Sequence, residues 1–563
     1  MDRQAIISLK VYKDNQIFLL NCQENESVLK ALQRQGLFIP AVCAGRGTCG
    51  KCRIHVLEGN LTISEQDKRV FTSGDLKDGY RLACLAFPRE DCVIRLMTEE
   101  EADFAVLAEI GFHGEVENNY DLNQILHVVG GRTEPEGKTE ASDNISPYAI
   151  AIDIGTTTIA MHLVDIDNGN IINTYTAVNK QRAYGADVIS RIQASCDGWK
   201  DSLRECIRMD LLEGIQMLMK NCTDAKVKRD ATDKRASNIT VDGHQVTEIV
   251  ISGNTTMGHL FMGYSCETLG HYPYQPVNNG WINLTFQEAY GVEYMDLPVT
   301  MLPGISTFVG ADITAGLLTC GFDRFDKPCM LIDLGTNGEM AIGNKEHIYV
   351  TSTAAGPAFE GGNITCGTGS IAGAISHVTI KKSRASYQTI GNREAIGICG
   401  TGVIELVSEL LKENIIDDTG LLLPEYFEEG YPLNERIIFT QKDVRELQLA
   451  KAAIRAGVET LINCYGITIQ ELDRIYLAGG FGYQVDLEKA IHIGLLPQEF
   501  RGKLIAAGNT SLAGAVKYLT ESSAKERMDQ IIASAQEIHL SNRQEFNDLY
   551  IEYMLFEKDD IEE

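Results

Sequence analysis

The chain has 563 residues, an apolar content of 44% and a formal net charge of −28, a length that predicts about three to four globular domains. The excess of negative charge repels phosphate backbones and argues against a nucleic-acid partner. No apolar run approaches the ~18 residues of a membrane-spanning helix, and the N-terminus MDRQAIISLK lacks a signal-peptide pattern, so we expect no membrane association and a cytoplasmic location.

The first hundred residues follow the order strand, strand, helix, loop, strand. Apolar patterning predicts strands over 5–12, 16–20, 53–57 and 92–96. Asn25 and Ser27 are helix-start signals for a helix that runs to Gln35. This order is typical of an α+β, β-grasp domain, which we expect to end near Thr98.

A cysteine-rich loop, AVCAGRGTCGKCR, lies between the predicted helix and the third strand. Cys43, Cys49 and Cys52 have the spacing C-x5-C-x2-C, and the glycines between them let the backbone turn its N–H groups inward. Cys84 in RLACLAF supplies a fourth thiolate. Plant-type [2Fe–2S] ferredoxins use this layout with one residue fewer in the first gap. The sequence therefore predicts a [2Fe–2S] cluster on these four cysteines.

The cysteines allow three alternatives. A structural zinc site usually pairs two short cysteine knuckles, and only one is present. A disulfide framework would need an oxidising compartment, of which the sequence gives no sign. Cys92, in the alternating strand DCVIRL, is a rival fourth ligand, although a small core residue is the simpler interpretation.

Residues 99–147 change character. The stretch GGRTEPEGKTEASDNISP over 130–147 is rich in Gly, Pro, Glu and Ser, a composition that is typical of a solvated linker. The preceding part of this region, residues 103–128, contains apolar residues and is expected to pack as one or two helices. We interpret 99–147 as a linker or reduced middle region.

A duplicated pattern begins at Tyr148. YAIAIDIGTTTIAMHLVDID predicts a buried strand, a polar glycine turn and a second strand, and CMLIDLGTNGEMAIG (329–343) repeats this about 180 residues later. Two copies indicate an internal duplication. A third motif, RIYLAGGFG (474–482), predicts a strand that ends at a pair of glycines. It follows a predicted helix over 444–461.

The polar turns suit the phosphates of ATP. Glycines at the hairpin tips let polyphosphate approach the backbone, and hydroxyl or amide side chains donate to it. Asp153 and Asp333, at strand ends, are the catalytic candidates, because they can hold Mg²⁺ through water and orient an attacking water. The residues predicted to bind the phosphates are Gly155, Thr156, Thr157, Thr158, Gly335, Thr336 and Asn337, and Gly479 and Gly480 leave room for the adenosine.

Residues 148–563 resemble the ASKHA superfamily (acetate and sugar kinase, Hsc70, actin). The resemblance rests on the first phosphate motif at Asp153–Thr158, the second at Asp333–Glu339 and the adenosine motif at Gly479–Gly482. It implies that Gly338, Glu339, Phe481 and Gly482 also bind ATP. It implies an α/β ATPase domain of two RNase H-like halves, following a ferredoxin-like domain over 1–98. SGNTTMGHL (252–260) and GICGTGVIELV (397–407) resemble the connecting segments, which either contact nucleotide or are strand-to-helix joints.

A [2Fe–2S] domain fused to an ASKHA ATPase resembles the reductive activators of corrinoid proteins over nearly the whole chain. The resemblance implies ATP-dependent, one-electron reduction of an inactive Co(II) corrinoid protein to Co(I), in a methyltransferase or O-demethylase system. It also implies a low-potential electron donor and a homodimer. Larger members carry a separate middle domain, for which 99–147 is too short.

Three other functions stay open on the sequence. One is an ASKHA-type small-molecule kinase with an appended redox domain. Another is an ATP-dependent activator of a radical dehydratase, with Cys366 and Cys399 as cluster ligands, although small residues beside glycine turns explain both cysteines. The third is an electron carrier with a non-hydrolysing ASKHA fold, against which the intact Asp153 and Asp333 argue.

The stretch 265–308 is predicted to be long and irregular. It forms either a partner-binding face or an ordinary surface loop. His259 and His271 lie nearby, and we expect ordinary surface or core histidines there rather than contacts to a corrinoid.

Overall fold

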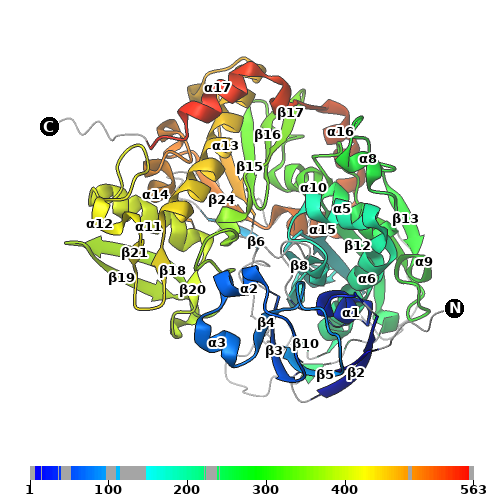
Figure 1. Cartoon of the computed structure of the whole chain (residues 1–563). Coiled ribbons are helices and arrows are strands. Elements are labelled where there is room, and N and C mark those ends of the chain that lie inside the picture. The colour runs from blue at the N-terminus through cyan, green and yellow to red at the C-terminus, as the bar shows by residue number, and fades with distance from the viewer. Residues whose placement is uncertain are drawn as a thin grey trace, which may run out of the picture.

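The computed structural model describes residues 7–13, 16–23, 25–35, 37, 39, 52–96, 110–113, 147–220, 222–223, 238–239, 241, 243–479 and 485–556. Its larger sheets have five, six and seven strands, and Figure 1 shows the five-stranded unit, in blue, at the lower edge of the molecule. Of the predicted site residues, Cys43, Cys49, Gly480, Phe481 and Gly482 lie outside the described residues.

The N-terminal unit is a five-stranded sheet with a short helix packed on it. The strand order is β2-β1-β5-β3-β4. Ser27 caps α1 (Val28–Arg34), whose apolar side chains join the core of the sheet. The prediction of a β-grasp fold is confirmed. The strands are β1 (Ile7–Lys13), β2 (Gln16–Cys22), β3 (Arg53–Glu58), β4 (Tyr80–Leu82) and β5 (Cys92–Leu96), and two further helices are α2 (Glu65–Val70) and α3 (Ser73–Lys77).

The six-stranded sheet has the order β13-β14-β12-β7-β8-β9. Strands β7, β8 and β9 form an antiparallel meander, and β12 and β14 continue the sheet in parallel with β7. The strands are β7 (Tyr148–Ile154), β8 (Thr158–Asp165), β9 (Ile171–Val178), β12 (Val246–Gly253), β13 (Ile282–Thr285) and β14 (Pro298–Met301). One apolar cluster joins its strands to α5 (Val188–Ala194), α6 (Lys200–Met219) and α7 (Thr255–Met262).

The seven-stranded sheet repeats this topology. Its order is β25-β17-β16-β15-β23-β24-β6. Strands β15, β16 and β17 form an antiparallel meander, and β23 and β24 are parallel to β15. The predicted duplication is therefore confirmed by two sheets with the same core order. The strands are β6 (Ile110–His113), β15 (Cys329–Leu334), β16 (Gly338–Gly343), β17 (Ile348–Thr353), β23 (Ile475–Ala478), β24 (Leu504–Gly508) and β25 (Ala535–Glu537).

Two helices lie between the duplicated sheets. α10 (Ala311–Cys320) packs against α15 (Thr510–Thr520), and their shared apolar cluster includes Val250 of one sheet and Leu331 of the other. On the outer face of the seven-stranded sheet lie α11 (Gly400–Lys412) and α13 (Gln441–Tyr465). α13 contains the helix predicted over 444–461. The halves thus share a core, and their β7–β8 and β15–β16 turns both contact the side chain of Glu360.

Two local predictions need correction. The helix expected within 103–128 is wrong for residues 110–113, which form β6 and pair antiparallel with β24. The reason is that β6 satisfies backbone groups at the open edge of β24, a partner nearly four hundred residues away that local sequence cannot reveal. The stretch 265–308 is not irregular throughout, since it contains β13, β14, α8 (Glu267–Gly270) and α9 (Phe286–Tyr290).

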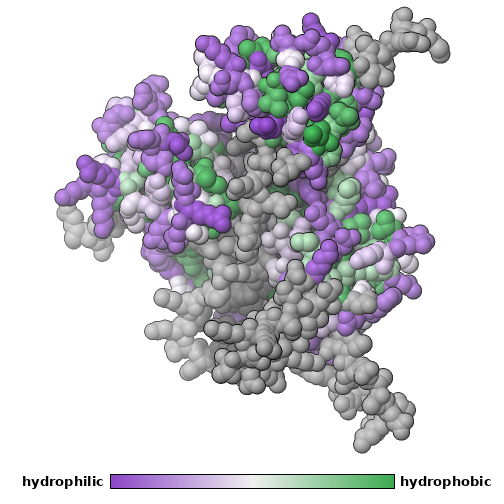
Figure 2. Space-filling model, turned by 90° about the horizontal axis from the view of Figure 1, so that it is seen from below, coloured by the Kyte–Doolittle hydropathy of each residue, from purple (hydrophilic) through white to green (hydrophobic). Residues whose placement is uncertain are grey.

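Hydrophilic residues cover most of the described surface on the face in Figure 2, and hydrophobic residues form separate patches there. This surface suits the 23% charged residues of the sequence. Within the described ranges, no helix is both long and apolar enough to cross a bilayer.

Candidate cluster site and nucleotide site

Cys52 and Cys84 come together although 32 residues separate them. β3 and β4 pair with Arg53 opposite Leu82, and the Ala83 N–H donates to the Cys52 carbonyl at 2.8 Å. The two buried sulfurs lie 3.3 Å apart. A disulfide would need about 2.05 Å, whereas two thiolates at this distance can bind one metal centre. The described pair therefore fits a [2Fe–2S] cluster, whose other predicted ligands are not described.

Cys92 occupies a different place. The register of β3 against β5 sets Ile54 opposite Leu96 and Glu58 opposite Val93. Cys92 is therefore at the far end of its strand from Cys52, four residues or about 13 Å along the strand from Leu96 at ~3.3 Å per residue. Its buried Sγ donates to the Glu90 carbonyl at 3.2 Å. These contacts suit a core residue.

The first predicted phosphate loop is the turn between β7 and β8, closed by the Gly155 N–H donating to the Thr158 carbonyl at 3.0 Å. Asp153 precedes the turn. Its Oδ2 accepts from Asn509 Nδ2 at 2.9 Å and its Oδ1 from Ser511 Oγ at 2.7 Å. Burial raises the pKa of Asp153, and these two hydrogen bonds act in the opposite direction. Residues at the start of α15 thus orient the candidate catalytic carboxylate.

Three neighbouring side chains donate hydrogen bonds to the β7–β8 turn. Asn254 caps α7 and donates from Nδ2 to Thr156 Oγ1 at 2.9 Å. The fully buried Arg191 of α5 donates to the Thr156 carbonyl. Asn179 donates to the Gly155 carbonyl at 2.9 Å. The segment SGNTTMGHL is therefore a strand-to-helix joint that also holds the loop.

The second predicted loop is the turn between β15 and β16. The Gly335 N–H donates to the Asn337 carbonyl at 3.0 Å. Asp333 and Glu339 are opposite each other in the β15–β16 ladder, so both side chains lie on the same face of the sheet. Gly338 packs against α13 so closely that a side chain there would clash with an isoleucine of that helix.

Gly479 borders the same site. It follows β23 with a φ of 94°, a conformation that favours glycine, and a Cβ there would meet the Asp333 carboxylate at 2.8 Å. Its N–H donates to the Gly508 carbonyl at 3.1 Å. Of the predicted adenosine motif, this is the residue that the structure describes.

Five carboxyl groups gather between the two loops. Burial, followed by the charges of Asp312, Asp153 and Glu360, raises the pKa of Asp333 to about 8. Burial and then Asp153 raise the pKa of Asp312 to about 7. Burial, Asp312 and Asp333 raise the pKa of Glu339 well above its usual range. These mutual effects place the groups within electrostatic reach of one another, and a bound cation would stabilise their ionised forms.

No three Asp, Glu, His or Cys side chains among the described residues are close enough to hold a metal ion together. Mg²⁺ usually keeps several waters and binds through one or two carboxylates together with substrate phosphates. Asp153 and Asp333, one from each hairpin, suit an ion held in this way. The β7–β8 and β15–β16 turns would then bind the phosphates, and the carboxylates would bind the ion.

Several residues of the site were not predicted from the sequence. Asn509 and Ser511 lie in AAGNTSLAG, which repeats the Gly-Asn-Thr of ISGNTTMG at another strand-to-helix joint, so this repeat was an available signal. Asp312 begins α10 in the phrase GADITAG. Glu360 accepts hydrogen bonds from Thr157 and Thr336, yet its phrase PAFEGG reads as an ordinary turn.

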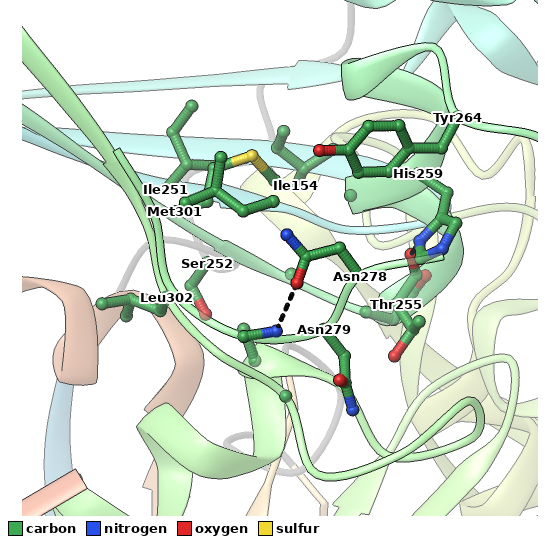
Figure 3. A pocket seen from close by; sticks show the side chains of 17 residues that line it. Ile154, Ile251, Ser252, Thr255, His259, Tyr264, Asn278, Asn279, Met301 and Leu302 are labelled. Carbon is green, nitrogen blue, oxygen red and sulfur yellow. Dashed lines mark hydrogen bonds between the residues drawn. The ribbon is translucent and has the colours of Figure 1, made fainter. Parts of the chain in front are cut away.

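A pocket adjoins the first loop, between the end of β12 and the loop that contains Asn278 and Asn279 (Figure 3). His259 lines it but is buried and engaged through both ring nitrogens. Nδ1 lies 2.8 Å from the Thr255 carbonyl, and Nε2 accepts from the Val277 N–H at 2.9 Å. His259 therefore holds the loop as a neutral core histidine, whereas His271 is exposed.

The second connecting segment lies at the start of α11. Cys399 is fully buried there and donates to the Ile375 carbonyl at 3.2 Å. Cys366 is partly exposed, and its Sγ lies 3.8 Å from the Arg436 carbonyl. These contacts fit small residues packed beside glycine turns.

Comparison with protein families agrees with this architecture. Residues 11–89 match a 2Fe-2S iron-sulfur cluster binding domain, residues 148–325 the RACo middle region, and residues 327–563 the C-terminal domain of RACo, the ASKHA domain. Fold and site together define an iron–sulfur protein with an ASKHA-type ATP-binding domain.

The chain belongs to the family of corrinoid activation enzymes. It is 30% identical to the corrinoid activation enzyme RamQ of Eubacterium limosum, over 92% of this chain and 94% of that protein. It is 28% identical to the [Co(II) methylated amine-specific corrinoid protein] reductase of Methanosarcina barkeri, over 72% and 76%. The solved structure of a reductive activator for corrinoid, iron-sulfur protein matches with a TM-score of 0.63 and 29% identity, over 97% of this chain and 98% of that one.

Proposed function

We propose that this protein is an ATP-dependent reductive activator. It returns an inactive Co(II) corrinoid protein to Co(I) by transferring one electron from its [2Fe–2S] cluster, and it serves a corrinoid methyltransferase or O-demethylase system. The observation that carries the proposal is the presence, in one chain, of the Cys52–Cys84 pair and of two opposed phosphate loops around Asp153 and Asp333. Membership of the corrinoid activation family supports it.

The domains divide the work in this proposal. Residues 1–98 hold the cluster through Cys43, Cys49, Cys52 and Cys84. Residues 99–147 tether this domain to the ATPase domain, 148–563, and allow the cluster to approach its partner. The close Cys52 and Cys84 sulfurs support the first assignment.

The ATPase site is assigned to the cleft between the duplicated hairpins. Asp153 and Asp333 hold Mg²⁺ through water and orient the water that attacks the γ-phosphate. Backbone and side-chain groups of 155–158 and 335–339 bind the phosphates, and 479–482 bind adenosine. The raised pKa values of Asp333 and Asp312 support a cation here, because a bound cation would stabilise their ionised forms.

ATP is needed for an energetic reason. Plant-type [2Fe–2S] clusters have potentials near about −400 mV, which is too high to reduce most Co(II) corrinoids directly. Binding and hydrolysis of ATP supply the difference by changing the conformation of the complex. The electron itself comes from a low-potential donor, and we propose a cytoplasmic homodimer as the working form.

An ATPase measurement tests this function. The anaerobic protein, with its iron counted and its spectrum recorded, is mixed with Mg²⁺ and ATP, with and without a Co(II) corrinoid protein. We expect two irons per chain and hydrolysis stimulated by the Co(II) form but not by the Co(I) form. Equal hydrolysis rates with the Co(II) and the Co(I) forms of the corrinoid protein would contradict the proposal. Phosphoryl transfer to a metabolite instead of water would identify a kinase.

A further inference from the structure

The carboxylate of Glu360 joins the two phosphate loops. Its Oε2 accepts a hydrogen bond from Thr157 Oγ1 at 2.8 Å and another from Thr336 Oγ1 at 2.9 Å. Thr157 belongs to the β7–β8 turn and Thr336 to the β15–β16 turn, whereas Glu360 ends a short 3₁₀ helix, η6 (Pro357–Glu360). One oxygen atom therefore connects the two halves of the duplicated domain.

Glu360 accepts the hydrogen bonds that the two threonine hydroxyls would otherwise donate to a phosphate. A threonine hydroxyl has a single hydrogen to donate, and both Thr157 and Thr336 donate theirs to Glu360. A phosphate oxygen at this place competes for the same two donors, and two anions in a poorly solvated cleft repel each other. The nucleotide can use both hydroxyls only after Glu360 has moved away.

Oε2 of Glu360 is the acceptor in both of its hydroxyl contacts. Burial raises the pKa of Glu360 above its usual range, and the hydrogen bonds from Thr157 and Thr336 and the charge of Arg191 oppose that shift in part. An ionised carboxylate accepts hydrogen bonds without donating any, which matches its two hydroxyl partners. The contact is therefore a carboxylate bridge that stands where phosphate is expected.

Glu360 also anchors a glycine-rich segment, residues 360–373, that folds back on itself. Gly361 has a φ of 74°, and a Cβ there would meet the Thr368 nitrogen at 2.8 Å. Further along, Thr365 is bound to Asp443 of α13, through its N–H at 2.7 Å and its Oγ1 at 2.9 Å. The segment is thus held by Glu360 at the loops, by Asp443 at α13, and by backbone hydrogen bonds of Cys366 and Thr368 to Ile398.

We propose that Glu360 is a positioning residue that binds the two phosphate loops to each other until ATP displaces it. Its displacement releases the N-terminal end of segment 360–373 from the two loops, while the contacts to Asp443 and Ile398 remain. ATP occupancy therefore changes the mobility of that segment. This inference rests on the proposed role of the two loops in binding ATP.

The test measures affinity for a non-hydrolysable ATP analogue with Mg²⁺, by calorimetry on the full-length protein. Glu360→Gln removes the charge and adds an amide that can donate to phosphate, so we expect binding about fivefold tighter, or more, than in the wild type. Glu360→Asp keeps the charge but is one methylene shorter, and we also expect tighter binding because it cannot reach both threonines. Glu346→Gln, in the exposed turn between β16 and β17, is the matched charge control and should bind as the wild type does.

Hydrogen exchange supplies a readout other than affinity. We expect the analogue to raise amide exchange over 360–373 in the wild type, and we expect Glu360→Gln to show raised exchange without nucleotide. If Glu360→Gln binds the analogue as tightly as the wild type or more weakly, the inference about Glu360 is overturned and the proposed ATP site is not. Wild-type affinity in Glu360→Asp would assign the effect to charge and contradict competition for the hydroxyls. Failure of the wild type itself to bind the analogue would overturn the ATP site.

Discussion

Asn509 Nδ2 donates to Asp153 Oδ2 at 2.9 Å, although 356 residues separate the two. Asn509 also caps α15, which packs between the duplicated sheets. The orientation of the candidate catalytic carboxylate therefore depends on a helix near the end of the chain. A change in how the two halves pack would be transmitted directly to Asp153.

Asp153→Asn should abolish ATP hydrolysis while ATP binding persists. The amide keeps the size of the side chain but cannot orient an attacking water or hold Mg²⁺ as a carboxylate does, so we expect the rate to fall about a hundredfold or more. Phosphate release measures the rate. Asp167→Asn, an exposed position in the turn between β8 and β9, is the control, and a rate for Asp153→Asn within about threefold of this control would contradict the assignment.

Cys84→Ser should lose the cluster, and Cys92→Ser should keep it. Cys84 lies beside Cys52, whereas Cys92 packs in the core at the far end of β5. We expect iron content and visible absorption to fall sharply in Cys84→Ser and to remain in Cys92→Ser, which should lose only about 1–3 kcal/mol of stability through its buried hydroxyl. Full iron content in Cys84→Ser would contradict the ligand set.

Gln33→Ala should loosen the contact between the ferredoxin-like domain and the six-stranded half. Gln33 of α1 is buried and donates to the Ala183 carbonyl, at the end of η2 (Lys180–Ala183), next to the Asn179 that holds the first loop. Losing this hydrogen bond costs about 1 kcal/mol. We expect faster amide exchange over 180–184 than in Gln35→Ala, an exposed control at the C-cap of α1, and equal exchange in both variants would contradict the contact.

Asp333→Asn should change how stability depends on pH. The folded-state pKa of Asp333 is raised to about 8, so between about pH 4 and pH 8 the folded protein binds more protons at this site than the unfolded chain. Its ionisation therefore lowers the stability of the nucleotide-free wild type as the pH rises. We expect the Tm advantage of Asp333→Asn to grow from about pH 4 to about pH 8 and then to level off. An advantage that is independent of pH would contradict the buried carboxylate cluster.

The architecture could be predicted because its signals are local and repeated. The two Asp-x-Gly-Thr hairpins indicated the duplication that the two matching sheets display. β6 could not be predicted, since its pairing with β24 is set by an open sheet edge far away in the sequence. Its own residues carry too few alternating positions to indicate a strand.

The site was predicted where the sequence has motifs and missed where it has single side chains. Asp153 and Asp333 stand in glycine-rich turns that indicate phosphate binding. Asp312 and Glu360 reach the cleft only because α10 and η6 fold back towards it, and a lone acidic residue gives no such signal. The Asn509 contact was detectable in principle, because its Gly-Asn-Thr repeats that of Asn254.

The central claim is that ATP drives the electron from the cluster to cobalt. The direct measurement is the anaerobic yield of Co(I) from a Co(II) corrinoid protein, followed by its absorption, with the reduced protein in the presence and absence of Mg²⁺ and ATP. The account predicts a high yield only with ATP, and a yield near the ATP-free level when Asp153→Asn replaces the wild type. Equal Co(I) yields with and without ATP would contradict it.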